Sequence, residues 1–464
     1  MLDKLRKADS IIFIFTSLLT NIGLLTLYSI TLTNNAIHGH LQNEFTNQLI
    51  YGFIGLVLAF LIFLIPLNYL RIKGILFVLY IITTVLLIYT LVFGVEINGV
   101  KRWINIGGTV LENGTIDGGI TIQASEFAKL TLIMIVSSIL STNIQPSERK
   151  FLLFNKIKKF VSEHIHILYA IIAAALLIGL IFAQKSLSVA IINAFIFSTI
   201  LLSSIKQKVR FILLCICLIG SLIISQNIFS ITNEWKLLMV LILFSIYLLN
   251  VYFKFISQLY LVLTLIAGII SGSLLFNIFW NNLLQEYQRD RVEAYLSPNT
   301  NIQAEDYQQY QSILSIGSGQ IFGQRFAQAT DNRLLLLPEP TTDFIFAIFS
   351  YKFGFVGGLI LISLYTVLIV RLYYLSDTMN DQFSSLVLVG IGSMIMIQCF
   401  FNIGMNLGLL PVGGTTLPFV SAGGSSLISM MIAIGLAENI IASNRLEKTT
   451  LQRNDKILIE GWNL

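Results

Sequence analysis

Long apolar runs recur along the chain and are separated by short polar segments. A helix needs roughly 20 apolar residues to cross the hydrocarbon core of a bilayer, and about twelve runs approach or reach that length. They cover residues 11–31, 49–69, 75–94, 126–141, 167–184, 187–204, 210–227, 236–253, 257–280, 343–370, 382–403 and 424–443. The pattern predicts an all-α polytopic membrane protein whose residues 1–464 form a single integral membrane domain. The first run has no small-residue cleavage pattern at its end, so we expect it to stay as a helix.

Basic residues gather in alternate short loops, and this predicts the orientation, because cytoplasmic loops carry an excess of lysine and arginine. With the N-terminus in the cytoplasm, that side receives Arg71, Lys73, Arg149, Lys150, Lys156, Lys158, Lys159, Lys206, Lys208, Arg210, Lys254, Arg371 and residues 445–453. An even number of spans returns the C-terminal tail, residues 444–464, to the cytoplasm. Residues 95–125 and 281–342 then form the two longest extracytoplasmic segments.

Composition agrees with this class of protein. Of the 464 residues, 55% are apolar and 11% are charged, whereas soluble globular chains carry about 25% charged residues. This shortfall excludes a soluble domain. The net charge of +5 is small for the length and follows from the orientation bias, so nucleic acid is not an expected partner.

The cysteines and histidines predict no metal site and no disulfide framework. The cysteines lie within apolar runs, where a thiol behaves as a small hydrophobe. The histidines form two pairs, neither with a cysteine or a third ligand nearby in the sequence. These residues are Cys215, Cys217 and Cys399, His38 with His40, and His164 with His166.

Two ionisable residues mark the end of the first extracytoplasmic segment. Glu126 and Lys129 are three residues apart at the start of an apolar run, so a helix places them on one face. Ionisable groups at membrane depth are costly and tend to be paired or functional. The alternative is that Ser125 caps the helix, Glu126 favours its dipole and Lys129 extends to the membrane boundary.

The large extracytoplasmic loop, residues 281–342, precedes the last three spans and has the length of a functional loop. Arg289 and Arg291 suit a phosphate or pyrophosphate, which guanidinium binds bidentately, or else they anchor the chain at the membrane surface. The glycine-rich turn at 317–323 does not follow a strand, which excludes a dinucleotide fold.

Glycine and proline crowd the last extracytoplasmic loop. They are Gly404, Gly408, Pro411, Gly413, Gly414, Pro418, Gly423 and Gly424, followed by Ser425 and Ser426. So many breakers imply irregular backbone, which is tolerated at membrane depth only where protein or a water-filled cavity surrounds it. We therefore expect a cavity built from this loop and the two long extracytoplasmic segments.

Blocks of residues spread over nearly the whole chain resemble, in the same order, the SEDS family, which includes FtsW, RodA and SpoVE. The matching residues are Asn98, Gly99 and 101–104; 123–129, against QPSEFAK; Arg291 and Pro298, leading to Tyr307, Gln308, Gln311 and Ser312; 317–323; Leu337, Pro338 and Glu339 with Thr342, Asp343 and Phe344; and 408–426, against GLLPxxGxxLPFxSxGGSS.

The resemblance implies a SEDS-like helical bundle of about 10–12 transmembrane helices, with the large extracytoplasmic loop before the last three spans. Ten spans are usual in the family, and region 205–256 adds two here. The implied activity is that of a peptidoglycan glycosyltransferase, which polymerises lipid II into undecaprenyl-linked glycan at the bacterial plasma (inner) membrane. A class B penicillin-binding transpeptidase is the implied partner. One sequence does not separate cell division from rod-shape elongation, although residues 415–419 lean toward the division branch.

Three acidic positions of the family are neutral or basic here. The family's QPDLG reads Gln-Lys-Ser-Leu-Ser at 184–188, and Tyr351 and Lys352 replace acidic residues after the TDFIFA run. Ungapped counting from Pro298 puts Asn301 where the family has its presumed base. We expect Lys352 to be buried beside a carboxylate or a polar cavity, since an unpaired ammonium costs about 2.5–3.5 kcal/mol on insertion scales.

The resemblance also implies a mechanism. One carboxylate takes the proton of the acceptor sugar hydroxyl, while cations offset charge on the pyrophosphate leaving group. The amide of Asn301 cannot accept a proton, so Asp306 and Glu305 are the expected substitutes. The cations are expected to be Arg102, Lys129, Arg289 and Arg291, and a divalent metal ion is left open. The full expected substrate-binding set is Arg102, Glu126, Lys129, Arg289, Arg291, Glu339, Asp343, Ser421 and Ser425.

Two alternatives remain open at this point. The first is a scaffold that keeps the SEDS fold and binds lipid II or a transpeptidase without turnover. The second is a lipid II flippase, which needs a site alternately open to both leaflets and as a rule shows inverted repeats. The sequence shows no internal repeat, so the flippase ranks last.

Overall fold

The computed structural model describes residues 2–34, 40–97, 100–110, 116–117, 120–142, 154–205, 289, 304–324 and 340–462. The chain divides into two compact units, Met1–Leu201 with Ser297–Leu464, and Leu202–Leu296. The first unit holds nearly all described residues, and the fold below is that of this unit. The three spans expected within 210–280 lie outside the described residues.

The described part of the chain is mainly helical. The helices are α1 Leu2–Arg6, α2 Ser10–Asn34, α3 His40–Leu64, α4 Leu67–Leu70, α5 Lys73–Phe93, α6 Ala124–Leu140, α7 Phe154–Ala183, α8 Leu187–Ser204, α13 Ala304–Ser318, α14 Ile345–Asp377, α15 Gln382–Asn406 and α16 Gly424–Trp462. Eight of the described helices are long and apolar enough to cross a membrane, and α6 falls short with 17 residues. The prediction of a polytopic helical membrane protein is confirmed.

The second span departs from its expected limits. The run 49–69 predicted one helix, whereas α3 begins earlier, at His40, and ends at Leu64. Pro66 stands immediately before the short helix α4. A proline disfavours helical backbone at the residue before it, which explains why the span stops there although the apolar residues continue.

The described residues between α5 and α6 include short strands, which the sequence analysis did not predict. The strands are β1 Val95–Ile97, β2 Val100–Ile106, β3 Thr109–Val110, β4 Ile116–Asp117 and β5 Ile120–Gln123. Strands β1, β2 and β5 make an antiparallel sheet in that order, with Trp103 opposite Gln123, and β3 pairs with β4. Since α6 starts at Ala124, directly after β5, the sheet fixes where this helix begins.

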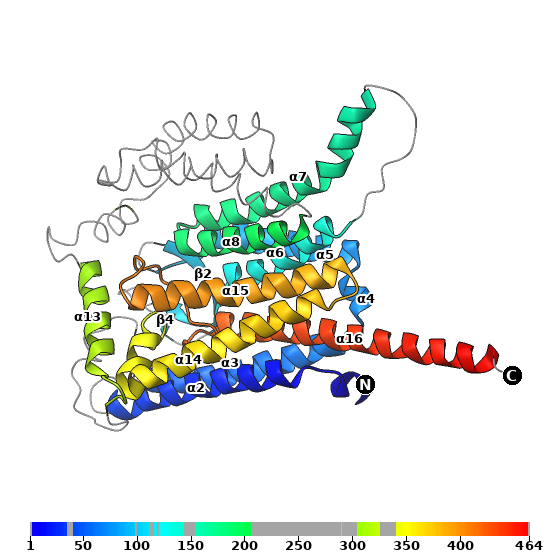
Figure 1. Ribbon diagram of the computed structural model, residues 1–464. Coiled ribbons are helices and arrows are strands. Elements are labelled where there is room, and N and C mark those ends of the chain that lie inside the picture. The colour runs from blue at the N-terminus through cyan, green and yellow to red at the C-terminus, as the bar shows by residue number, and fades with distance from the viewer. Residues whose placement is uncertain are drawn as a thin grey trace, which may run out of the picture. The chain divides into compact units, whose positions relative to one another are not determined.

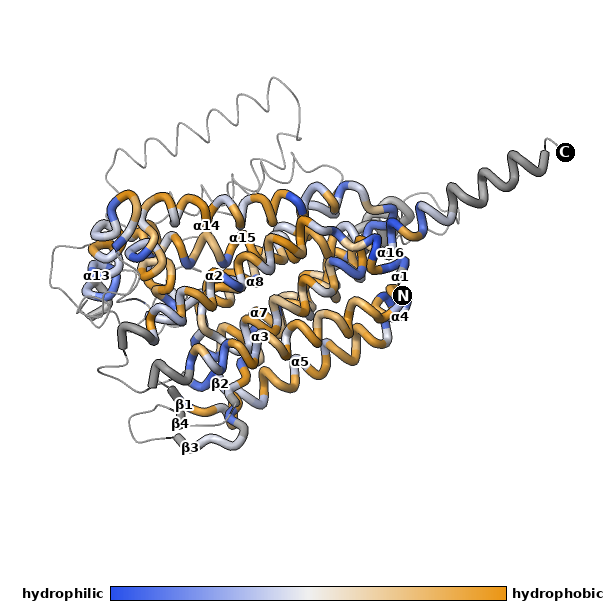
Figure 2. The backbone as a smooth tube through the Cα atoms, turned by 90° about the horizontal axis from the view of Figure 1, so that it is seen from below, coloured by the Kyte–Doolittle hydropathy of each residue, from blue (hydrophilic) through white to orange (hydrophobic). Residues whose placement is uncertain are grey.

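The spans have apolar sides and polar ends. Figure 2 shows hydrophobic colouring along the helices and hydrophilic colouring toward both ends of the bundle. The chain's two ends and α4 lie at one end of this unit, opposite the sheets and α13 (Figures 1 and 2). Large apolar side chains on α2, α3 and α5 are exposed, among them Phe13, Phe53 and Phe93, whereas α15 and α16 are mostly buried. These two helices therefore form the interior, with α16 packed along α3 and α15 along α14.

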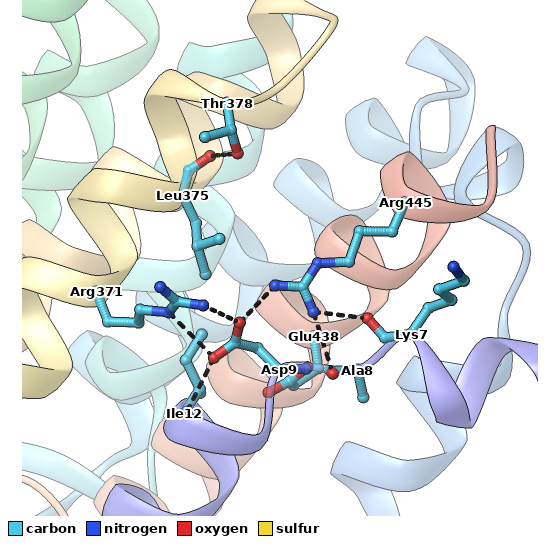
Figure 3. A network of polar contacts seen from close by, with 9 residues as sticks. All are labelled: Lys7, Ala8, Asp9, Ile12, Arg371, Leu375, Thr378, Glu438 and Arg445. Carbon is cyan, nitrogen blue, oxygen red and sulfur yellow. Dashed lines mark hydrogen bonds and ion pairs between the residues drawn. The ribbon is translucent and has the colours of Figure 1, made fainter. Parts of the chain in front are cut away.

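A buried aspartate joins three helices at the end that holds the termini (Figure 3). Asp9, directly before α2, accepts from the Arg371 guanidinium of α14 at 2.7 Å and from that of Arg445 in α16 at 2.6 Å. Its Oδ1 also accepts from the Ile12 N–H at 3.4 Å, and its own N–H donates to Glu438 Oε2 at 2.7 Å. One carboxylate thus stabilises the start of α2 and ties it to α14 and α16.

Asp9→Asn is expected to destabilise this junction. Asp9 is only 2% exposed, so the amide loses two charge-assisted hydrogen bonds in a site that water cannot refill. Each hydrogen bond to a charged group contributes about 1.5–3 kcal/mol. The thermal midpoint of the detergent-solubilised variant should fall, while Asp377→Asn, which alters an exposed carboxylate, should leave it unchanged.

The Asp9 contribution should also depend on pH. Burial raises the pKa of the Asp9 carboxyl, but the hydrogen bonds and charges of Arg371 and Arg445 outweigh it, so the pKa lies below its ordinary 3.8. A lowered pKa stabilises the fold fully above the unfolded value of about 3.9 and ceases to do so as the pH falls through the folded value. The difference in unfolding midpoint between the parent and Asp9→Asn should therefore shrink as the pH falls below about 4. A difference that grows on acidification would contradict this.

Candidate functional site

Glu126 and Lys129 form a buried ion pair in the first turns of α6. Lys129 Nζ lies 2.7 Å from Glu126 Oε2, and the two residues are 0% and 5% exposed. The expected alternative, in which Ser125 caps the helix and Lys129 extends to the boundary, is wrong, because Gln123 holds the N-cap position and Lys129 is fully enclosed. Ser429 Oγ of α16 donates to the same Glu126 oxygen at 3.4 Å, so the pair fixes α6 against α16.

Residues 407–423, between α15 and α16, form a glycine-rich loop of irregular backbone, as the sequence predicted. Its second half, from Thr415 to Ala422, is mostly buried in protein, whereas Leu407 and Leu409 are exposed. Gln48 of α3 donates from Nε2 to the Ser421 carbonyl at 3.0 Å and accepts the Gly423 N–H at 3.1 Å. The Tyr365 hydroxyl of α14 donates to the Pro418 carbonyl. Side chains of neighbouring spans thus supply the hydrogen bonds that regular secondary structure would otherwise provide.

Helix α2 approaches this loop so closely that only glycine fits at position 23. A Cβ on Gly23 would lie 2.7 Å from Val420 Cα and 2.9 Å from the Phe419 carbonyl oxygen. Phe419 itself adopts a positive φ of 67°. The loop is therefore held from the α2 side by direct backbone contact.

Asp343 lies in the turn that leads into α14, beside the glycine-rich loop. Its carbonyl accepts from Asn402 Nδ2 at 2.9 Å and from Asn406 Nδ2 at 3.0 Å, both on α15. Asn402 also donates to the Thr415 carbonyl at 2.7 Å. The Asp343 carboxylate is half-buried, and its Oδ2 is 3.5 Å from the position that a Cβ on Gly414 would take. The two asparagines therefore hold the Asp343 turn and the loop together.

Ser421 and Ser425, two of the expected binding residues, both bond to backbone. Ser421 Oγ accepts the Leu417 N–H at 2.8 Å and donates to the Thr342 carbonyl at 2.6 Å. Ser425 Oγ, in the first turn of α16, accepts the Gln123 N–H at 3.0 Å. The first serine ties the loop to the Asp343 turn, and the second ties α16 to the end of β5.

Arg102 reaches the junction between α7 and α8 from strand β2. Its guanidinium donates to the Lys185 carbonyl at 2.6 Å, and Lys185 has a positive φ of 59°. Three positions of this junction, Lys185, Ser186 and Ser188, depart from the family's QPDLG. Ser186 is buried, and its hydroxyl has no hydrogen-bond partner among the described residues. Ser188 Oγ lies 2.8 Å from the position of a Cβ on Gly413, so the junction also touches the glycine-rich loop.

Lys352 is buried in α14, as expected. Its Nζ donates to the Ser29 carbonyl of α2 at 2.9 Å. The acceptor that the structure describes is thus a backbone carbonyl of a neighbouring span. Its burial was correctly predicted, whereas the expected carboxylate or polar cavity beside it stays a prediction.

The structure places Asp343 and Ser421 at the glycine-rich loop, and Glu126, paired with Lys129, and Ser425 at the first turns of α16 that follow the loop. Arg102 contacts the α7–α8 junction. A substrate cavity lined by all of them stays a prediction. Asn301, Arg291 and Glu339 lie outside the described residues, and Arg289 belongs to the second unit. Glu305 and Asp306 lie in the first turn of α13, with side chains outside the described set. Among the described residues, no three His, Cys, Asp or Glu side chains group as metal ligands.

Sequence reasoning missed the polar residues that hold the loop. Gln48 lies in α3, just before the expected span 49–69, and Asn402 and Asn406 lie at the end of α15, with only Asn402 inside the expected span 382–403. Asn402 and Asn406 are four apart on one face of α15. Amides facing the interior of a helical bundle need partners, so this spacing in an apolar run was an available signal.

The stability of the fold should depend strongly on the ion pair of α6. Glu126→Gln leaves the Lys129 ammonium buried without its counter-charge, which typically costs about 3–5 kcal/mol. The double variant Glu126→Gln with Lys129→Met should recover much of that loss, since apolar replacements of a buried pair are often neutral. Thermal unfolding in detergent measures both, and Glu447→Gln, on an exposed carboxylate, serves as control. Equal destabilisation by the single and double variants would contradict the pairing.

Comparison with known proteins identifies the family of the chain. The family model FtsW/RodA/SpoVE, described as "Cell cycle protein", matches residues 9–243 and 211–446. The peptidoglycan glycosyltransferase RodA of Treponema pallidum is 27% identical over 94% of this chain and 97% of its own length. Stage V sporulation protein E of Bacillus subtilis is 42% identical, but the alignment spans only 34% of this chain and 43% of that protein.

A solved structure supports the fold. A chain from a peptidoglycan synthase complex, whose study concerns the coordination of polymerisation and crosslinking, superposes with a TM-score of 0.59 over 94% of this chain and 98% of that one. At 23% identity the likeness concerns the fold alone. The family match covers more than half of the sequence, including α6, the Asp343 turn and the glycine-rich loop. The chain is therefore a polytopic membrane protein that belongs to the FtsW/RodA/SpoVE family, the peptidoglycan glycosyltransferases of bacterial cell-wall synthesis.

Proposed function

We propose that the chain polymerises lipid II into undecaprenyl-linked glycan, with a class B penicillin-binding transpeptidase as its partner. The observation that carries the proposal is that Asp343 lies beside the glycine-rich loop and Glu126 beside Ser429, in the α16 turns that follow this loop, at the end of the bundle opposite the termini. A buried carboxylate and a half-buried one beside a rigid loop suit a site that must exclude water and orient a sugar.

Helix α13 supports Asp306 and Glu305 as candidates for the base. Gln309, within one turn of both, donates from Nε2 to the Met405 carbonyl at 2.9 Å and to the Leu410 carbonyl at 2.7 Å. Ser312 Oγ donates to the Asn406 carbonyl at 3.0 Å. The first turn of α13 is thus held to the C-terminal end of α15 and to the glycine-rich loop. A base must sit at a fixed distance from the proton it takes, and this tether supplies such a fixed position.

In the proposed reaction, a hydroxyl of the acceptor sugar loses its proton to the carboxylate of Asp306 or Glu305. Its oxygen attacks the anomeric carbon of the donor, and the bond to the donor's pyrophosphate breaks. Cationic side chains offset the charge that builds on the leaving pyrophosphate. Arg102, Arg289 and Arg291 are the candidates for direct contact. Lys129 is fully enclosed and acts in this proposal through Glu126, whose orientation it fixes.

Purified protein incubated with labelled lipid II tests the proposal. Asp306→Asn should reduce polymer formation by roughly the 10²- to 10⁴-fold of a lost general base, while lipid II binding stays nearly unchanged. Glu305→Gln, measured alongside, shows which carboxylate takes the proton. Asp377→Asn removes an exposed carboxylate at the far end of α14 and is the matched control, with activity equal to that of the parent.

The same assay decides between the enzyme and its rivals. A parent that binds lipid II without forming polymer, together with a gain of activity on Asn301→Asp, would establish the scaffold. Movement of lipid II between liposome leaflets without polymer would establish the flippase. An active parent whose Asp306→Asn and Glu305→Gln variants both keep full activity would remove the proposed base.

A further inference from the structure

Helix α13 packs on the protein with its polar face. Gln309 bonds to carbonyls of α15 and of the glycine-rich loop, and Ser312 bonds to Asn406. Ser312 and Ser315 are 0% and 1% exposed. A helix at the surface of a soluble protein does the opposite and turns its apolar face inward. The inward face of α13 therefore carries side chains that hydrogen-bond to α15 and to the glycine-rich loop.

The outward face of α13 and of the turn that follows is apolar. Tyr310 is 59% exposed, Ile313 44%, Ile321 59% and Phe322 81%. Tyr307 and Leu314 complete this face, which we call the α13 stripe. From Tyr307 to Phe322 the sequence carries no charged residue. A water-facing surface of this length would ordinarily carry charges, so water is a poor neighbour for the stripe.

The stripe continues directly into the exposed side of a transmembrane helix. Gly354 interrupts α14 with a φ of 69°. The next two N–H groups of α14 donate to the turn that follows α13: Phe355 to the Gln320 carbonyl at 2.8 Å and Val356 to the Ile321 carbonyl at 3.1 Å. Phe355 is itself 68% exposed, and Leu359 and Ile360, one turn further along the span, are exposed as well. Because α14 is a transmembrane span, this neighbouring surface faces lipid.

The direction of α13 suits the surface of a membrane. The spans run roughly side by side, whereas α13 lies across their ends (Figures 1 and 2). A helix transverse to the spans lies near the plane of the bilayer, and amphipathic helices in that plane insert their apolar face at the boundary between headgroups and acyl chains. Tyrosines are enriched at this level because the ring is apolar and the hydroxyl reaches water.

We propose that α13 and its following turn form an in-plane membrane anchor, with the α13 stripe inserted among the lipid acyl chains of the leaflet at that end of the bundle. The occupant of the stripe is bilayer lipid, since the stripe is continuous with the lipid-facing side of α14 and lacks charge. Tyr307 and Tyr310 lie at the headgroup level, and Ile321 and Phe322 insert beside Phe355.

One consequence rests on the proposed function. The first turn of α13 carries Glu305 and Asp306. An anchor of this kind sets the height of the candidate base above the acyl chains, so that it meets the sugar of a lipid-linked acceptor at a fixed distance from the membrane. The lipid contact itself does not depend on this role.

Spin labels test the anchor in the full chain reconstituted in lipid bilayers. Single cysteines are placed at Tyr310 and Phe322, in a background with Cys215, Cys217 and Cys399 replaced by serine or alanine. Phe355→Cys is the lipid-facing reference and Lys101→Cys, on an exposed residue of β2, the water-facing one. Collisions with oxygen, which concentrates in acyl chains, are compared with collisions with a water-soluble nickel chelate.

At Tyr310 and Phe322 the expected result is strong oxygen collisions and loss of nickel collisions, as at Phe355. Labels that behave as at Lys101 would overturn the proposal, because the stripe would then face water. Labels shielded from both reagents would overturn it as well, because protein would then cover the stripe, either other parts of this chain or a second copy. These readings do not use lipid II, so their failure is distinguishable from failure of the glycosyltransferase proposal.

Discussion

Backbone groups at membrane depth need hydrogen-bond partners from the protein itself, and the site depends on this constraint. The glycine-rich loop is irregular over seventeen consecutive residues, 407–423, among helices that cross the bilayer. Gln48, Asn402, Ser421 and Tyr365 supply the missing bonds from three spans and from the loop itself. These bonds hold the loop in place without regular structure, and a loop held in this way can present backbone groups that a helix would hide.

The bundle itself was predictable because span length and apolar composition are read from single residues. The expected spans within the described residues appear as helices, although α3 begins earlier than expected, at His40, and ends at Leu64, before Pro66. The sheet at 95–123 was missed for a physical reason. Its strands are at most seven residues long and interrupted by glycines, so no alternation runs far enough to signal pairing.

The sequence indicated which residues belong to the candidate site, but not which residues they contact. A charge at a membrane boundary marks Glu126 and Lys129 as paired or functional, and they do pair with each other. The bond from Ser429, however, spans 303 positions of sequence. The same holds for Lys352, whose burial follows from its place in a span, whereas its partner, the Ser29 carbonyl, lies 323 positions away. Helix packing selects such partners, and a single sequence does not reveal which faces meet.

Helix α16 connects the candidate site with the Asp9 junction at the other end of the bundle. Ser425 and Ser429 in its first turns meet strand β5 and Glu126, while Glu438 and Arg445 contact the Asp9 junction. The twenty residue steps from Ser425 to Arg445 span about 30 Å at 1.5 Å per residue. A continuous helix is stiff along its axis, so an axial displacement of Arg445 also displaces Ser425. Through α16, a displacement at the Asp9 junction can therefore move the helix turns beside Glu126 on the opposite side of the membrane.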